Sequence, residues 1–263
     1  MMLGWNIFPY IAAVVMLLST TAALLAAIAK GNNRAWALGT ALLSVALLAA
    51  FVAMLWHTLG RPPLRTMGET RLWYSLFLLL AGVMTYARWH YRWIMCFSTL
   101  LASVFMIINI ARPELHDHTL MPALQSPWFV PHVAVYMFSY ALLGCATLLS
   151  LYALIRPTAD VGKATDRLLC AGIAFFTFGM LSGSLWAKEA WGTYWNWDPK
   201  EAWAAATWMI YLAAIHLRLH RPDCRGLFKA VVVVGFCALQ MCWWGVNYLP
   251  NVERSVHTYN IDN

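Results

Sequence analysis

Long apolar runs separated by short polar connections form the dominant pattern along the chain. A hydrocarbon core about 30 Å thick requires about 20 residues of α-helix, because each residue adds about 1.5 Å. The pattern predicts spanning helices over residues 7–29, 35–57, 72–89, 92–110, 131–155, 167–187, 199–218 and 228–249. The first run has no basic segment before it and is too long for the apolar part of a signal peptide, so we expect it to be retained.

Composition supports this interpretation and excludes several classes of protein. Of 263 residues, 62% are hydrophobic and only 11% are charged, whereas soluble domains are about half apolar. We therefore expect an all-α fold, a polytopic integral membrane helical bundle of about eight transmembrane helices, forming one membrane domain over residues 1–263. The net charge of +7 is spread over short connections, which argues against nucleic-acid binding. The six cysteines form no CxxC pair, so neither a disulfide framework nor covalently attached haem is indicated.

The distribution of cations predicts the orientation of these helices. The connections 30–34, 88–92, 156–167 and 218–229 share one side and hold 11 of the 18 Lys and Arg residues. By the positive-inside rule this side is cytoplasmic and both termini lie outside. The start of the fifth helix, the connection between the sixth and seventh, and the end of the eighth then meet on the outer side.

The connection between the sixth and seventh helices is the least ordinary part of the sequence. Residues 191–203 read Trp-Gly-Thr-Tyr-Trp-Asn-Trp-Asp-Pro-Lys-Glu-Ala-Trp. Asp198 as N-cap, Pro199 at the first helical position and Glu201 at the third predict a capping box and a helix that begins at Pro199. The indoles of Trp191, Trp195 and Trp197 precede this helix and are expected to form an aromatic shelf at the membrane surface. An interfacial aromatic belt alone is the simpler alternative.

Two histidines flank this shelf in the predicted topology. His132 opens the fifth helix and His257 follows the eighth, and each alone would be satisfied by water. Together, two neutral imidazoles can ligate a haem iron axially while indoles shield the macrocycle. His216 lies near the cytoplasmic end of the seventh helix, where an ionisable side chain is either functional or simply reaches the interface.

The loop over residues 60–71 is basic on the predicted outer side. Guanidinium groups of Arg61 and Arg65 could bind carboxylates such as haem propionates through charge-assisted hydrogen bonds. Ion pairing with Glu69, or contact with lipid phosphate, is an equally acceptable alternative.

The 191–203 stretch, in its WGxYWxWDPKExW form, resembles the WWD signature of haem-handling proteins. That form is similar to the CcsA/ResC-type cytochrome c biogenesis proteins of the system II cytochrome c synthase. The resemblance extends over most of residues 56–259, including Ser126-Pro127-Trp128, Gly60-Arg61-Pro62-Pro63 and His257-Thr258-Tyr259.

The resemblance implies delivery of haem b to the outer, periplasmic side of a bacterial inner or plasma membrane. It further implies haem-lyase activity, that is, thioether attachment to the CxxCH segment of apocytochrome c, in complex with a CcsB/ResB-type subunit. His132 and His257 would be the axial ligands, with Trp191, Trp195 and Trp197 against the porphyrin. His216 would be a membrane histidine on the inward route of haem.

No general acid or base is assigned, because Asp198 and Glu201 are explained as helix caps. Two alternatives remain open. A WWD-type haem exporter or chaperone would bind haem without making thioethers. A haem b membrane anchor would pass electrons between quinone and a partner.

Overall fold

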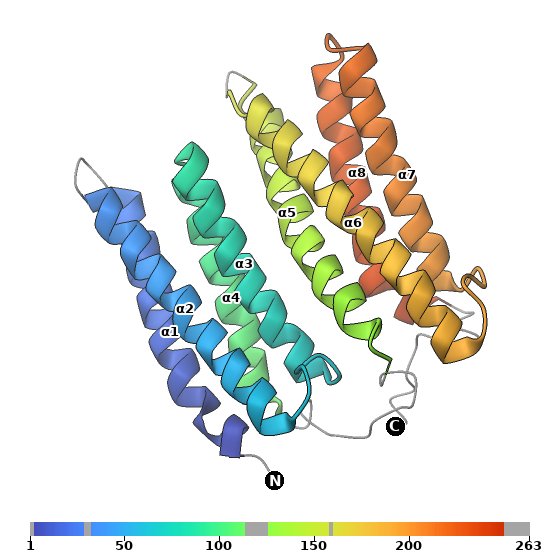
Figure 1. Ribbon diagram of the computed structural model, residues 1–263. Coiled ribbons are helices and arrows are strands. Elements are labelled where there is room, and N and C mark those ends of the chain that lie inside the picture. The colour runs from blue at the N-terminus through green and yellow to red at the C-terminus, as the bar shows by residue number, and fades with distance from the viewer. Residues whose placement is uncertain (1–2, 29–32, 114–125, 158–159, 250–263) are drawn as a thin grey trace. The chain divides into compact units, whose positions relative to one another are not determined.

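The computed structural model describes residues 3–28, 33–113, 126–157 and 160–249 (Figure 1). All regular structure in these ranges is helical, which confirms the predicted all-α class. The helices are α1 (Leu3–Ile28), α2 (Asn33–Leu59), α3 (Met67–Trp89), α4 (Arg92–Ala111), α5 (Phe129–Ile155), α6 (Gly162–Trp191), α7 (Pro199–His220), α8 (Arg225–Trp243) and the short 3-10 helix η3 (Gly245–Tyr248).

Seven of the eight α-helices in the described ranges are long and apolar enough to cross a membrane, which supports an integral membrane protein. The exception is α3, which carries Glu69 and Arg71 in its first turns. Figure 1 shows α3 running along α4. The eighth crossing remains a prediction.

The helices form two compact units, an N-terminal unit over residues 1–124 and a C-terminal unit over residues 125–263. Within each unit, consecutive helices alternate in direction (Figure 1). Short connections favour such antiparallel neighbours. The single membrane domain expected from the sequence stays a prediction, since each unit is compact by itself.

Aromatic rings and small residues hold the N-terminal unit together. The rings of Trp5 and Phe8 pack edge to face at a centroid distance of 5.3 Å, and both contact Phe51 on α2. Gly82 on α3 lets α4 approach closely, because a Cβ at this position would lie 2.7 Å from the Ser98 Cβ. The unit is therefore built by close packing of helix faces, as expected where apolar surface alone does not drive helix association in lipid.

The α5–α6 pair of the C-terminal unit shows the same principle in a regular register. Three glycines of α6 each lie against a larger α5 side chain: Gly172 opposite Leu143, Gly179 opposite Tyr136 and Gly183 opposite His132. A Cβ at any of the three would come within 2.8 Å of the opposing side chain. These glycines let the backbones of α5 and α6 approach, and the last of them fixes where His132 lies.

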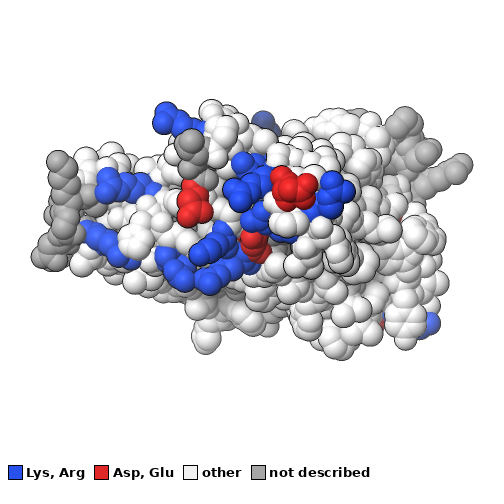
Figure 2. Space-filling model, turned by 90° about the horizontal axis from the view of Figure 1, so that it is seen from above, with Lys and Arg blue, Asp and Glu red and all other residues white. Residues whose placement is uncertain are grey.

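The two ends of the C-terminal unit differ in chemistry. The connections after α5 and after α7 lie at one end, and the start of α5 and the α6–α7 connection lie at the other (Figure 1). Figure 2 views the first of these ends and shows Lys and Arg side chains gathered on it. This is the concentration of charge from which the sequence predicts the cytoplasmic side.

Candidate functional site

The tryptophan-rich stretch begins with a fixed turn. Helix α6 ends at Trp191, and Gly192 follows in the left-handed region with a φ of 81°, donating its N–H to the Lys188 carbonyl at 3.0 Å. The Lys188 ammonium donates to the Gly192 carbonyl at 2.7 Å and lies 5.3 Å from the Tyr194 ring centroid. Glycine is the residue that adopts this conformation without steric cost. The turn is therefore held by both backbone and side-chain contacts.

The stretch ends in the predicted capping box, which the structure confirms. Glu201 accepts hydrogen bonds at Oε2 from the Asn196 N–H at 2.8 Å and the Asp198 N–H at 3.2 Å. Asp198 accepts at Oδ1 from the Lys200 N–H at 2.8 Å, and Pro199 is the first helical residue. Both carboxylates are buried. They are occupied in ordering the chain between the turn at Gly192 and the start of α7.

His132 lies in the first turn of α5 and faces α6. Its Nδ1 is 2.9 Å from the Gly179 carbonyl oxygen. Because a carbonyl can only accept a hydrogen bond, the proton resides on Nδ1 and the lone pair on Nε2. This is the arrangement in which a histidine ligates a metal while its other ring nitrogen is oriented by the protein.

Aromatic rings and a glycine fix the plane of the His132 imidazole. The ring stacks on Trp186 at a centroid distance of 5.3 Å and an interplanar angle of 26°, and meets Tyr136 edge to face at 4.8 Å. A Cβ at Gly183 would lie 2.5 Å from Nδ1. Any larger residue at position 183 would therefore displace the imidazole.

A cavity of about 140 Å³ opens beside His132 among the ends of the four helices. Small-molecule sites are more often about 300–1,000 Å³, so this cavity encloses only part of a flat ligand of porphyrin size. The remainder of such a ligand would lie across its mouth. Its aromatic and histidine lining comprises His132, Tyr136, Tyr140, Trp186, Tyr194, Trp195 and Trp243, and its polar lining includes Lys200, Glu201 and Cys242.

The three predicted tryptophans occupy different places around this cavity. Trp195 lines it, whereas Trp191 packs edge to face on Trp186 at 4.8 Å and supports that ring. Trp197 is 73% exposed, contacts Trp195 at 5.8 Å, and has a φ of 57°. A non-glycine residue in the left-handed region costs free energy, and such positions cluster at functional sites. Of the three tryptophans expected to form an aromatic shelf, Trp195 therefore lines the cavity, Trp191 packs behind Trp186, and Trp197 is exposed.

Other predicted site residues lie elsewhere. His257 falls outside the described residues. His216 is exposed on α7, with its ring parallel to that of His220 at 6.1 Å, and lies about 25 Å along the helix axis from Pro199. The structure does not bring His216 to the His132 cavity. In the described part of the chain, no group of three or more His, Cys, Asp or Glu side chains could hold a metal ion.

Arg61 and Arg65 belong to the N-terminal unit, where both donate hydrogen bonds to the Glu69 carboxylate, Arg61 from its guanidinium and Arg65 from its backbone N–H. Arg61 donates to both Glu69 carboxylate oxygens at 3.0 and 2.9 Å, and the Arg65 N–H donates to Oε2 at 2.7 Å. This ion pair is one of the alternatives left open by the sequence. Burial, and then the charge of Arg61, lowers the pKa of the Arg65 guanidinium, while Glu69 opposes the shift.

Sequence reasoning missed most of the cavity lining, including Tyr136, Tyr140 and Trp186. They lie inside apolar helices, where residues that face lipid and residues that face protein have similar composition. One available signal was Gly179 and Gly183, a GxxxG pair on α6, because such spacing marks close helix contact in membranes.

Comparisons with known proteins show the family to which the chain belongs. A family model described as "Cytochrome C assembly protein" matches residues 5–252. The cytochrome c biogenesis protein CcsA of Chlamydomonas reinhardtii is 32% identical over 237 residues, covering 82% of this chain and 66% of that protein. CcsA of Nymphaea alba is 30% identical over 247 residues, covering 78% of this chain and 79% of that protein.

A solved structure, the cytochrome c heme lyase CcmF, matches with a TM-score of 0.73 at 15% identity, covering 92% of this chain and 47% of that one. At this identity the likeness shows a shared fold. The family model covers the helices of both units and the tryptophan-rich stretch. The chain therefore belongs to the cytochrome c assembly protein family and is of the CcsA type.

Proposed function

We propose that this chain delivers haem b to the outer face of the membrane and supports its attachment to apocytochrome c, acting as a haem lyase with a CcsB/ResB-type subunit. Family membership supports the general role in cytochrome c biogenesis. The observation that carries the proposal is His132, oriented through Nδ1 by a backbone carbonyl at the edge of an aromatic cavity.

In this proposal the haem substrate is held between two imidazoles. His132 supplies Nε2 as one axial ligand, and His257 supplies the other. Trp195 and Trp197, which contact each other, lie against the macrocycle, and Trp191 supports the Trp186 ring on which His132 stacks. The hydrogen bond to Gly179 stabilises the tautomer in which Nε2 bears the lone pair, and the surrounding rings exclude water.

The proposed reaction adds two cysteine thiols of a CxxCH segment to the two haem vinyl groups. In each addition the S–H bond breaks, sulfur bonds to one vinyl carbon and the hydrogen ends on the other, so no net oxidation occurs. The nucleophile comes from the apocytochrome, and this chain contributes positioning and control of the iron through its ligands. We assign no acid or base to it, since Asp198 and Glu201 are engaged in the capping box.

The rest of the proposal concerns route and orientation. The basic end of the C-terminal unit would face the cytoplasm, which would place the His132 end in the periplasm. His216 would then contact haem on its inward route. Arg61 and Arg65 would contact propionates, Arg61 through N–H groups that Glu69 does not occupy.

Reduced absorption spectra of the purified full chain test the ligands. We expect His132→Gly and His257→Gly to lose the bound-haem signal, and added imidazole to restore part of it by filling the space left by the side chain. His90→Gly is a matched control, because His90 is exposed at the end of α3 with a φ of 63° that glycine accepts. Spectra of the His132 and His257 variants identical to that of the unmodified chain would refute the axial assignment.

Co-expression with a CcsB-type subunit and an apocytochrome tests the reaction. Covalent haem on the apocytochrome, detected after denaturing electrophoresis, is expected with the unmodified chain and should be lost in the His132→Gly variant. Haem that is bound and passed on without thioether formation would instead identify an exporter or chaperone. Bound haem that is reduced by quinol and never transferred would indicate an electron-transfer anchor.

A further inference from the structure

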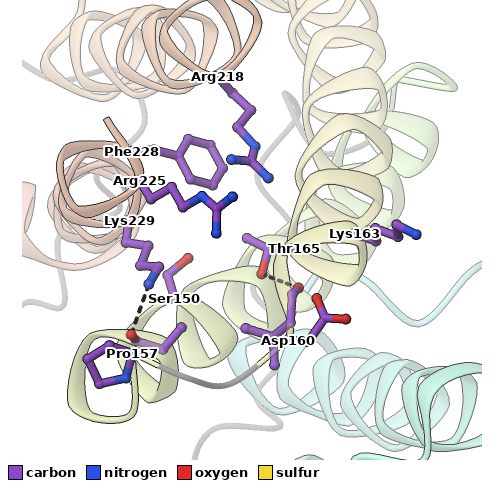
Figure 3. Close-up of a pocket in the computed structure, with 12 residues that line it drawn as sticks. Ser150, Pro157, Asp160, Lys163, Thr165, Arg218, Arg225, Phe228 and Lys229 are labelled. Carbon is purple, nitrogen blue, oxygen red and sulfur yellow. Dashed lines mark hydrogen bonds between the residues drawn. The ribbon is translucent and has the colours of Figure 1, made fainter. Parts of the chain in front are cut away.

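A second cavity lies at the basic end of the C-terminal unit, away from His132 (Figure 3). Its volume is about 490 Å³, and residues of α5, α6, α7 and α8 line it. Among the described residues, its cationic lining comprises Lys163, Arg218, Arg225 and Lys229, and Asp160 is the one carboxylate that lines it. The cavity is therefore electropositive, and none of its lining residues takes part in the proposed haem site.

Three of these cations converge on one space. Figure 3 shows Arg218 and Arg225 directed toward the same space, with Lys229 beside it. The Lys229 ammonium donates to the Ala153 carbonyl at 2.9 Å, which places it against the last turn of α5. Gly162 allows the Arg218 guanidinium to approach α6, because a Cβ there would lie 3.2 Å from Nη2.

The charges are only partly neutralised within the protein. Arg218 pairs with Asp166 at 3.1 Å and lies over the Phe228 ring at 5.3 Å. Arg225 is exposed, and its side chain makes no hydrogen bond or ion pair within the described residues. An anion that entered the cavity would therefore meet one uncommitted guanidinium and two further cations that retain unused N–H groups.

Backbone donors add to this positive potential. Helix α6 begins at Gly162 with no side-chain cap and no acidic residue in its first turn. Helix α8 begins at Arg225, likewise with no side-chain cap. The first N–H groups of a helix lack intrahelical partners and carry a partial positive charge, which favours a phosphate-like anion. Both helix starts contribute lining residues to the cavity.

We infer that this cavity binds a phosphate group. Converging guanidinium, ammonium and backbone N–H donors suit a tetrahedral oxyanion, and the apolar lining of Val161 and Phe228 accommodates an attached carbon chain. The phosphate could belong to an anionic phospholipid head group or to a soluble phosphate compound, and the two sources share this chemistry.

The full chain in detergent, titrated with inorganic phosphate and with pyrophosphate by calorimetry, tests the soluble source. Nanodiscs of phosphatidylglycerol or phosphatidylcholine, followed by native mass spectrometry of retained lipid, test the membrane source. We expect Arg225→Gln to weaken binding about tenfold or more, the effect of losing one charge-assisted contact. Lys229→Met should weaken binding as well, because it removes a second cation from the same space.

Arg221→Gln is the matched control, because Arg221 lies in the α7–α8 connection near Arg225 and is also exposed, but pairs with Asp223 and does not line the cavity. Binding that falls in the Arg225 and Lys229 variants but not in the Arg221 variant supports the site, and the arm that responds identifies the source. Equal binding in all variants, or no binding in either arm, would overturn the inference. The haem spectrum should stay unchanged throughout, so this test is independent of the proposed haem site.

Discussion

The two ends of the C-terminal unit are built from the same four helices, but helix α7 at one end begins with a side-chain cap and helices α6 and α8 at the other end do not. At the aromatic end, α7 begins with the capping box of Asp198 and Glu201, so its first backbone donors are satisfied by the protein. At the basic end, α6 and α8 begin without side-chain caps, and cations surround their starts. The start of α7 is therefore closed by its own side chains, whereas the starts of α6 and α8 leave donors available to an external anion. Helix α5, which also begins at the aromatic end, has no side-chain cap.

The two ends therefore suit binding in different ways, one through fixed geometry and the other through positive charge. The aromatic end fixes geometry: carbonyl, glycine and ring contacts hold His132 in one orientation. The basic end supplies charge, with long side chains that can adjust to what they bind. Substitutions of the buried contacts at the aromatic end should therefore lower stability strongly, whereas substitutions at the basic end should change stability little and anion binding clearly.

The largest expected effect comes from removing the carboxylate that orders the tryptophan-rich stretch. Glu201→Ala leaves the Asn196 and Asp198 N–H groups without their acceptor, and we expect a loss of about 2–4 kcal/mol of stability. The haem signal should fall with it, because Trp195 would no longer be held at the cavity. Thermal unfolding and reduced spectra of the purified protein measure the two effects.

Glu201→Gln serves as the matched variant for this prediction, since its amide oxygen can still accept from the backbone. It should lose clearly less stability than the alanine variant. If both variants unfolded at the temperature of the unmodified chain, the capping contacts would not be what orders the aromatic end.

A smaller structural effect is expected from Gly183→Ala. The added methyl carbon would lie 2.5 Å from His132 Nδ1, so the imidazole must turn away from the Gly179 carbonyl. Overpacking of this kind costs about 1–3 kcal/mol, partly offset by the better helix propensity of alanine, about 1 kcal/mol. Haem occupancy should fall much more than stability, which spectra and unfolding on the same sample can separate.

Gly144→Ala on α5 is the control, because its nearest neighbour would be the Phe236 ring at 3.6 Å, an ordinary contact. This variant should be neutral or slightly more stable and should retain haem. Haem retained equally in both variants would contradict the claim that Gly183 positions the His132 ring.

The positions of the helices and the start of α7 could be predicted from the sequence, whereas the orientation of side chains inside the apolar helices could not. Long apolar runs locate the helices, and the Asp198-Pro199-Lys200-Glu201 sequence places the start of α7 because capping is a local interaction. The start of α5 and the tryptophan-rich stretch do meet at one cavity, as the topology predicted. The orientation of side chains within the apolar helices was not accessible, since hydrophobic periodicity loses contrast where lipid surrounds the protein.

The basic cavity illustrates a second limit. The sequence showed that cations concentrate in the connections, but not that Arg218 and Lys229, eleven positions apart and on different helices, line one cavity. Nor could it show that α6 and α8 begin without side-chain caps, because a cap depends on backbone geometry as well as residue type. The concentration of positive charge at this end could be predicted by counting Lys and Arg residues. The gathering of these side chains around one cavity depends on how the four helices pack.

At the basic end, Asp166→Asn should change the stability of the fold little and the affinity for phosphate more. The Arg218–Asp166 pair is partly exposed, and pairs of this kind contribute about 0–1 kcal/mol. Removing the negative charge leaves Arg218 available to an anion, so phosphate affinity should rise at low salt and the gain should shrink as salt is added. Calorimetry at two ionic strengths measures this. Weaker binding in the variant would count against an anion site at this cavity.

The smallest expected effect on the fold is at Trp197, where stability and function should separate most clearly. Trp197→Gly relieves a left-handed backbone that costs about 1–2 kcal/mol and removes a ring contact with Trp195 of about 0.5–1.5 kcal/mol, so the two terms nearly cancel. The thermal midpoint should therefore move little, and Trp197→Asn, which also tolerates this conformation, should behave similarly. If the exposed indole contacts the porphyrin, both variants should retain less haem per protein, whereas Trp36→Ala, which removes an exposed tryptophan on α2, should not. Unchanged haem content in both Trp197 variants would show that the exposed ring stands apart from the site, leaving Trp195 as the tryptophan of the 191–203 stretch that walls the cavity.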